Sequence, residues 1–175
     1  LHSVNGMVER GWVPPVLSRK IIHMGTGPLF VLCWMFFSDG DYTRGLAALV
    51  PICFTGIFVA TGLGWMDNPQ LVRSSTREGN PQELLRGPLY YGIIFVICTL
   101  VFWRQSPVGM MALMMMSGGD GLADVVGRRW GSRKLPFNPD KSWVGSAAMF
   151  TGSVVFAGIM LAVFNGLGYF VPVLP

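Results

Sequence analysis

The sequence predicts an all-α, polytopic membrane protein, a transmembrane helical bundle with about five spans. Two observations support this prediction. Of the 175 residues, 51% are hydrophobic and only 13% are charged, which is more apolar and less charged than an ordinary soluble domain. The apolar residues also gather in long uncharged runs, as helices that cross about 30 Å of hydrocarbon require.

Five hydrophobic stretches make up the predicted bundle. They comprise residues 21–37, 45–65, 88–103, 107–117 and 144–164. The second and fifth are long enough to span a bilayer unaided, at about 1.5 Å per residue. The fourth spans only if the "GGDGLADVV" that follows continues the same helix, which would bring Asp120 and Asp124 to the membrane surface. Because no repeat or linker interrupts the chain, we expect residues 1–175 to form a single membrane-embedded domain.

Basic residues are distributed unequally between the two sides of the predicted bundle. Threading the chain through five spans places eleven of the 13 Lys and Arg residues on one side and leaves only Arg44 and Arg104 opposite. This bias follows the positive-inside rule. The same side also holds acidic residues, which topology does not explain. Two interpretations stay open: topology alone, or topology together with a polyanion and metal site.

The stretch 118–145, "GGDGLADVVGRRWGSRKLPFNPDKSWVG", contains the residues best suited to chemistry. In a helix, Asp120 and Asp124 share one face, and such a pair beside phosphates suits magnesium. Glycines allow close approach of backbone N–H groups to phosphate oxygens, and basic side chains offset their charge. The alternative is a juxtamembrane loop with capping aspartates, packing glycines and topogenic basic residues. No soluble nucleotide-binding motif is present.

The same stretch, extended to "GGDGLADVVGRRWGSRKLPFNPDKSWVGS", resembles the signature of the polyprenol kinase family, and most closely that of its plant and algal phytol kinases, with farnesol kinases as near relatives. Three further blocks resemble the family in the expected order. They are "LSRKIIHMGTG", "STREGNPQELLRGPLYY" and "FWRQSPVGMMALMMMSGGDG". Together the blocks cover most of residues 17–150.

The resemblance implies an integral membrane enzyme that transfers the γ-phosphate of CTP to phytol or a related isoprenoid alcohol, with Mg²⁺ as cofactor. It implies a plastid membrane as the location and tocopherol biosynthesis as the pathway. The implied partners are the lipid alcohol, the nucleoside triphosphate and the bilayer, without nucleic acid. Family members continue beyond a fifth span, whereas this chain ends at Pro175. We therefore expect a fragment that holds part of the site.

The resemblance also assigns roles to individual residues. Asp120 and Asp124 are expected to bind the metal and, with Lys141, to form the catalytic group; either aspartate could accept the alcohol proton. The expected triphosphate contacts from the signature are Gly119, Gly121, Gly127, Arg128, Lys134 and Ser142.

Two other blocks contribute candidate nucleotide-binding residues. In the central loop, Arg77, Glu78 and Arg86 either clamp phosphates or brace the loop through ion pairs. At the N-terminal end, Arg19, Lys20 and His23 lie within about one helical turn of one another. His23, inside an apolar run, is either a packed, hydrogen-bonded residue or a participant in the chemistry.

Other functions fit the same residues. A farnesol or dolichol kinase would differ only in the alcohol. A cytidylyltransferase that forms a CDP-lipid carries a related "DxxA…G…K[ST]" pattern and would release pyrophosphate instead of CDP. A transporter or assembly subunit could line an ion path with Asp120 and Asp124, but it would place charged groups deep in several helices, where this sequence has chiefly His23.

Overall fold

The computed structural model describes residues 15–38, 40 and 42–169, with side chains from Lys20 onward. Backbone contacts divide the chain into two compact units. We call Leu1–Trp34 with Arg104–Pro175 the signature unit and Met35–Trp103 the central unit. Arg10, which the topology prediction counts, lies outside the described residues.

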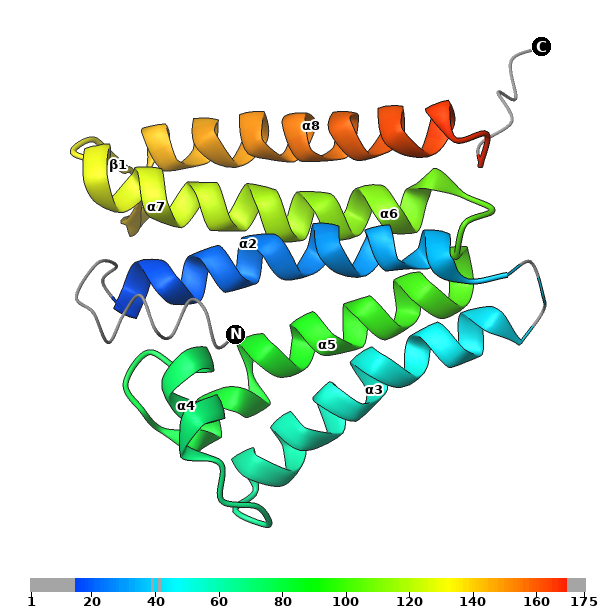
Figure 1. Cartoon of the computed structure of the whole chain (residues 1–175). Coiled ribbons are helices and arrows are strands. Elements are labelled where there is room, and N and C mark those ends of the chain that lie inside the picture. Colours follow the sequence, from blue (N-terminus) through cyan, green and yellow to red (C-terminus); the bar gives the residue numbers. More distant parts are fainter. Residues whose placement is uncertain (1–14, 39, 41, 170–175) are drawn as a thin grey trace. The chain divides into compact units, whose positions relative to one another are not determined.

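The signature unit consists of three long helical rods. The first is α2 (Pro15–Cys33), which the 3-10 turn η1 (Trp34–Phe36) follows. The second is continuous through α6 (Pro107–Met114), the π-helical turn η4 (Met115–Gly119) and α7 (Asp120–Trp130). The third is α8 (Trp143–Gly166). The α6–η4–α7 rod packs against α2 on one side and α8 on the other (Figure 1).

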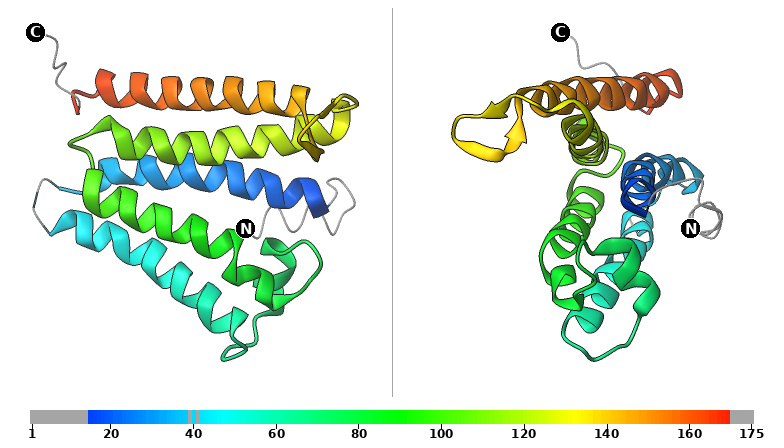
Figure 2. Two further views of the ribbon diagram at one scale, coloured as in Figure 1. Left: turned by 180° about the vertical axis from the view of Figure 1, so that it is seen from behind. Right: turned by 90° about the vertical axis from the view of Figure 1, so that its left-hand side faces the viewer.

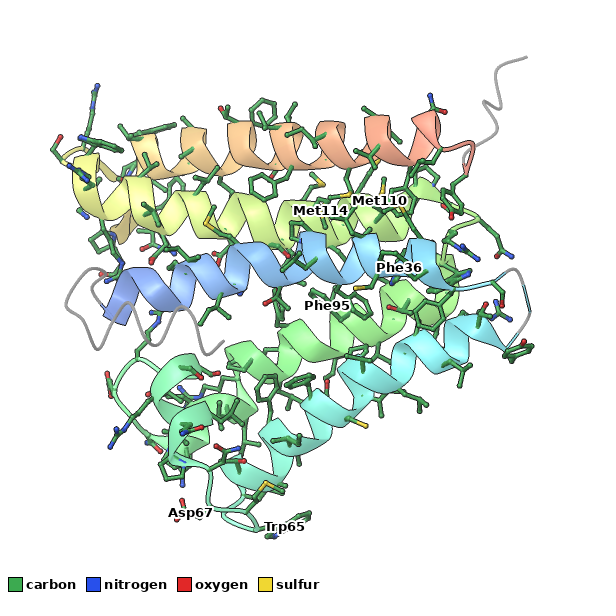
Figure 3. All side chains as sticks on the ribbon, in the orientation of Figure 1. Phe36, Trp65, Asp67, Phe95, Met110 and Met114 are labelled. Atoms are coloured by element: carbon green, nitrogen blue, oxygen red, sulfur yellow. The ribbon has the colours of Figure 1, made fainter. Side chains whose placement is uncertain are left out.

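Local sequence sets the start of the second rod, and small residues set its packing. Ser106 caps its start by accepting a hydrogen bond from the N–H of Val108, with Pro107 in the first turn. Along the rod, Gly118 lies against the ring of Phe156 of α8, and Gly27 of α2 lies against Ser117, with no space for a Cβ at either glycine. Met110 and Met114 are fully buried in this packing (Figure 3).

Between α7 and α8 the chain forms a small antiparallel hairpin that the all-α prediction did not include. Its strands are β1 (Lys134–Leu135) and β2 (Asn138–Ser142), with Lys134 opposite Ser142. Pro136 and Pro139 disfavour a helix here, and Asn138 accepts a hydrogen bond from the N–H of Asp140. The hairpin projects from the end of the unit where α7 ends and α8 begins (Figure 2).

In the central unit, two helices pack along each other. They are α3 (Thr43–Gly62) and α5 (Gly87–Ile97), the latter continued by the π-helical turn η3 (Cys98–Phe102). The connection between them carries α4 (Pro69–Ser75) and the 3-10 helix η2 (Pro81–Leu85). Gly92 of α5 allows the close approach of α3, because a Cβ there would overlap the hydroxyl of Thr55.

The prediction of a helical membrane protein is confirmed. Among the described residues, three helices are long and apolar enough to cross a membrane, Thr43–Gly62, Pro81–Phe102 and Trp143–Gly166, and a shorter apolar helix covers Lys20–Phe36. Three of the five predicted stretches therefore meet this criterion. The fourth stretch does continue as a helix through "GGDGLADVV", but the charges of α7 interrupt its apolar character.

Candidate active site

The predicted N-terminal and signature residues meet where α2 packs on α7. Lys20 and His23 lie one turn apart on α2, and Asp120 and Asp124 lie one turn apart on α7, so each pair shares a helix face. Gly121 permits this packing, because a Cβ at that position would overlap the side chain of Met24. The contact between the helices therefore turns four polar side chains toward one another.

The distances show a connected group of charges, which we call the carboxylate cluster: Lys20, His23, Asp120, Asp124 and Arg128. The ammonium nitrogen of Lys20 lies 3.5 Å from Oδ2 of Asp120 and 3.5 Å from Oδ2 of Asp124. Nε2 of His23 lies 3.6 Å from Oδ2 of Asp120. Nε of Arg128 donates a hydrogen bond of 3.0 Å to Oδ1 of Asp124. Lys20 thus bridges the two carboxylates.

The members of the carboxylate cluster differ in their access to solvent. The Lys20 side chain is only 10% exposed and that of Asp124 16%, whereas the side chain of Asp120 is 51% exposed. Partial burial by itself raises the pKa of Asp124, but the hydrogen bond from Arg128 and the charges of Lys20 and Arg128 outweigh it and hold that pKa below its ordinary value. Asp124 is therefore a firmly held anion, and Asp120 is the open one.

The donor atoms of the cluster suit a hard cation in part. Magnesium is usually held by one or two carboxylates, with water and substrate phosphates completing its shell, and Asp120 and Asp124 provide that number. Among the described residues, no group of three or more His, Cys, Asp and Glu residues could hold a metal by itself. Any divalent cation at Oδ2 of both aspartates would also have to displace the Lys20 ammonium.

The three signature glycines lie at helix contacts. A Cβ placed on Gly119 would overlap the hydroxyl of Ser153 and would lie 3.1 Å from the carbonyl oxygen of Met149. A Cβ placed on Gly127 would lie 3.4 Å from the Cα atom of Gly145. With Gly121 against α2, the glycines bring α7 close to both of its neighbours. Packing thus accounts for all three, and their predicted contact with phosphate stays a prediction.

The predicted hairpin residues are placed in two ways. Lys134 and Lys141 are exposed on β1 and β2. Ser142 is buried, 4% exposed, and caps α8: its hydroxyl oxygen accepts a hydrogen bond of 3.1 Å from the N–H of Gly145. The side chain of Arg19, on α2, lies outside the described residues.

The remaining predicted residues, Arg77, Glu78 and Arg86, belong to the central unit. Within the described residues, none of them forms a side-chain ion pair within 4 Å. The loop is instead braced by Glu83, whose carboxylate accepts hydrogen bonds from the backbone N–H groups of Arg77 (2.8 Å) and Glu78 (3.0 Å). Asn80 and Glu83 have the spacing of a capping box, which would direct Glu83 to the N–H of Asn80, so the sequence did not signal its bonds to Arg77 and Glu78.

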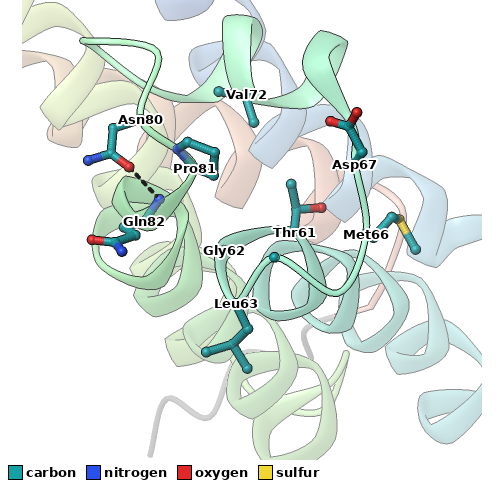
Figure 4. Close-up of a pocket in the computed structure, with 10 residues that line it drawn as sticks. Thr61, Gly62, Leu63, Met66, Asp67, Val72, Asn80, Pro81 and Gln82 are labelled. Carbon is teal, nitrogen blue, oxygen red and sulfur yellow. Dashed lines mark hydrogen bonds between the residues drawn. The ribbon is translucent and has the colours of Figure 1, made fainter.

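A cavity of about 440 Å³ opens in the central unit between the end of α3 and η2 (Figure 4). Asp67, Asn80 and Gln82 line it together with Thr61, which is 2% exposed. Arg86 lines a neighbouring hollow of about 420 Å³ with Gln82 and Leu85. Arg77 and Glu78 line neither of these two.

Curated plant proteins match this chain over almost its whole length. The probable chloroplastic phytol kinase of Triticum aestivum is 50% identical over 169 residues, which is 97% of this chain and 56% of that protein. The chloroplastic phytol kinase 1 of Arabidopsis thaliana is 43% identical over 167 residues, 95% of this chain and 55% of that protein. The chloroplastic farnesol kinase of the same plant is 36% identical over 161 residues, 92% of this chain and 52% of that protein.

The chain is similar to plant phytol kinases over nearly its whole length. The resemblance read from the four sequence blocks is therefore confirmed, with farnesol kinase as a more distant relative. The chain spans about half the length of the curated relatives it matches. No family model matches the chain, and no solved structure matches it.

The structure brings together residues of two of the sequence blocks that carry this similarity. Lys20 and His23 come from the N-terminal block and Asp120, Asp124 and Arg128 from the signature. The sequence predicted each pair to share a helix face. It gave no sign that the two pairs contact each other, since that depends on the packing of Met24 on Gly121.

Proposed function

We propose that this chain forms part of a membrane-bound kinase that phosphorylates phytol or a related isoprenoid alcohol, with the carboxylate cluster at its reacting centre. The observation that carries the proposal is the placement of Asp120 and Asp124 on one face of α7, at the end of an apolar rod, in a chain homologous to phytol kinases. Phosphoryl transfer depends mainly on alignment and charge stabilisation. A paired carboxylate site beside basic residues supplies both.

We propose CTP as the donor and Mg²⁺ as the cofactor. Asp120 and Asp124 would hold the ion, which when bound would offset negative charge on the transferred phosphoryl group. Exposed basic residues of α7 and the hairpin would attract the triphosphate: Arg128, Arg129, Arg133, Lys134 and Lys141.

The two aspartates are suited to different tasks. Asp124 is 16% exposed and fixed by Arg128 and Lys20, so it serves as a fixed negative charge. Asp120 is 51% exposed and is the carboxylate that an incoming hydroxyl can reach, which favours it as the acceptor of the alcohol proton. His23, 3.6 Å from Oδ2 of Asp120, helps to orient that carboxylate.

The long apolar tail of the alcohol would remain in the bilayer while its hydroxyl reaches α7. Moving the tail into water would cost about 0.8 kcal/mol per CH₂ group, so a site at the membrane surface avoids that cost. Large apolar side chains are exposed along α8, as expected for contact with lipid: Phe150, Val154, Val155 and Ile159. We propose a plastid membrane as the location, in line with the chloroplastic relatives, and tocopherol biosynthesis as the use of the product.

The test compares Asp120→Asn and Asp124→Asn with wild type in membranes that carry the full-length protein. Transfer of the γ-phosphate of labelled CTP to phytol should fall by about 10²-fold or more in each variant, because a charged group at the transition state is lost. The matched control is Asp140→Asn, which neutralises an exposed aspartate on the hairpin. Near-normal turnover by both site variants, with normal membrane levels, would refute this site.

The same assay separates the related activities. Farnesol should be tested beside phytol because one relative is a farnesol kinase, and ATP should be tested beside CTP. Release of CDP identifies a kinase, whereas release of pyrophosphate identifies a cytidylyltransferase.

A further inference from the structure

The Lys20 ammonium lies where a bridging cation would lie. It is 3.5 Å from Oδ2 of both Asp120 and Asp124, and its side chain is 10% exposed. Like charges at this helical spacing repel each other, and partial burial increases the cost of leaving them uncompensated. The Lys20 ammonium therefore supplies, between the two carboxylates, positive charge of the kind that a bridging divalent cation would supply.

The negative charges of the two aspartates are already balanced without a metal. Asp120 and Asp124 contribute two negative charges, and Lys20 and Arg128 contribute two positive charges. A free divalent cation would add two uncompensated positive charges beside an enclosed ammonium. A divalent cation that arrives with a triphosphate brings negative charge with it, so the same cluster can accept it at far lower electrostatic cost.

We propose that Lys20 is an internal counter-cation that excludes a free divalent cation from Asp120 and Asp124, so that metal and nucleotide bind cooperatively. This inference rests on the proposed function, because it takes the two aspartates as the metal site. Lys20 is in this respect a positioning residue: it acts through the carboxylates. Its flexible stem allows the ammonium to withdraw when the metal and its phosphates enter.

The experiment measures binding of Mn²⁺, a paramagnetic substitute for Mg²⁺, to the full-length protein in lipid nanodiscs. Free Mn²⁺ is followed by electron paramagnetic resonance, with and without a non-hydrolysable CTP analogue. We expect wild type to bind Mn²⁺ weakly alone and more tightly with the analogue. Lys20→Met should bind Mn²⁺ without nucleotide more tightly than wild type by about tenfold or more, because a like charge within about 4 Å is removed. The analogue should then add little.

Three further variants make the result specific. Lys20→Arg keeps the charge and should behave as wild type. Lys20→Gln is neutral but retains a hydrogen-bond donor, and it replaces Lys20→Met if that variant does not fold. Arg44→Met removes an exposed positive charge from the central unit and should leave Mn²⁺ binding unchanged.

The outcomes separate this inference from the proposed function. If wild type binds Mn²⁺ with the analogue in a manner that requires Asp120, but neither neutral Lys20 variant binds it more tightly alone, the counter-cation role is refuted and the metal site stands. If no variant binds Mn²⁺ under any condition, the metal site and the counter-cation role are refuted together. The role of Lys20 is also contradicted if both neutral variants keep kinase activity but bind Mn²⁺ without nucleotide as weakly as wild type does.

Discussion

Gly121 is the position at which packing and chemistry are most directly coupled. A Cβ there would overlap Cγ of Met24 and lie 2.7 Å from its Sδ. For Gly121→Ala, the methionine can move at a cost of about 1 kcal/mol, and the gain of about 0.5–1 kcal/mol from removing a mid-helix glycine nearly cancels that cost. Gly121→Val adds the Cβ and two methyl groups on a stiff χ1 torsion, so we expect a net loss of about 2–3 kcal/mol.

Gly121→Val should also impair phosphoryl transfer, because α2 must move away from α7 and take Lys20 and His23 with it. The assays are thermal unfolding in nanodiscs and phytol phosphorylation in membranes. Gly158→Val is the matched control, since Gly158 also lies inside a helix but has no atom within 4 Å of a built Cβ. If Gly121→Val were as stable and as active as Gly158→Val, the packing argument would be wrong.

Two further predictions concern charge. The pKa of Asp124 is lowered in the folded protein. Its ionised form therefore stabilises the fold at pH values above the unfolded-state pKa of about 3.9, and this stabilisation is lost as pH falls through the folded-state pKa. Unfolding measured from neutral to acidic pH should therefore show a smaller acid-side loss in Asp124→Asn than in wild type or Asp140→Asn. Glu83→Gln should weaken two charge-assisted hydrogen bonds to the loop, by about 1–3 kcal/mol together. Faster amide hydrogen exchange at Arg77 and Glu78 would confirm this, and unchanged exchange would contradict it.

Short-range patterns in the sequence predicted the helices and much of the site. Asp120 and Asp124 are four residues apart, and helical periodicity alone predicts that they share a face. The apolar runs likewise predicted α3 and α8, whose lengths match the spans. Such features depend on neighbours within a few residues, which a sequence displays directly.

Features that depend on contact between distant segments were not predictable in this way. The meeting of Lys20 with Asp124 joins positions more than 100 residues apart, and it depends on how deeply Met24 packs on Gly121. The glycines for which we predicted phosphate contacts lie at helix contacts. The sequence did not reveal this packing, because glycine suits a helix contact and a phosphate contact equally well. The hairpin was missed because its two strands are too short, at two and five residues, for an alternating pattern to stand out.

The π-helical turn η4, Met115–Gly119, ends immediately before Asp120. Such a turn takes up an extra residue within an otherwise α-helical rod. If the same residues formed an ordinary α-helix, everything beyond them would rotate by about 100° and advance by about 1.5 Å. Both carboxylates would then turn away from α2, although every residue of the cluster would still be present. The direction in which the aspartates point is therefore set one turn earlier, in a segment that carries no charge.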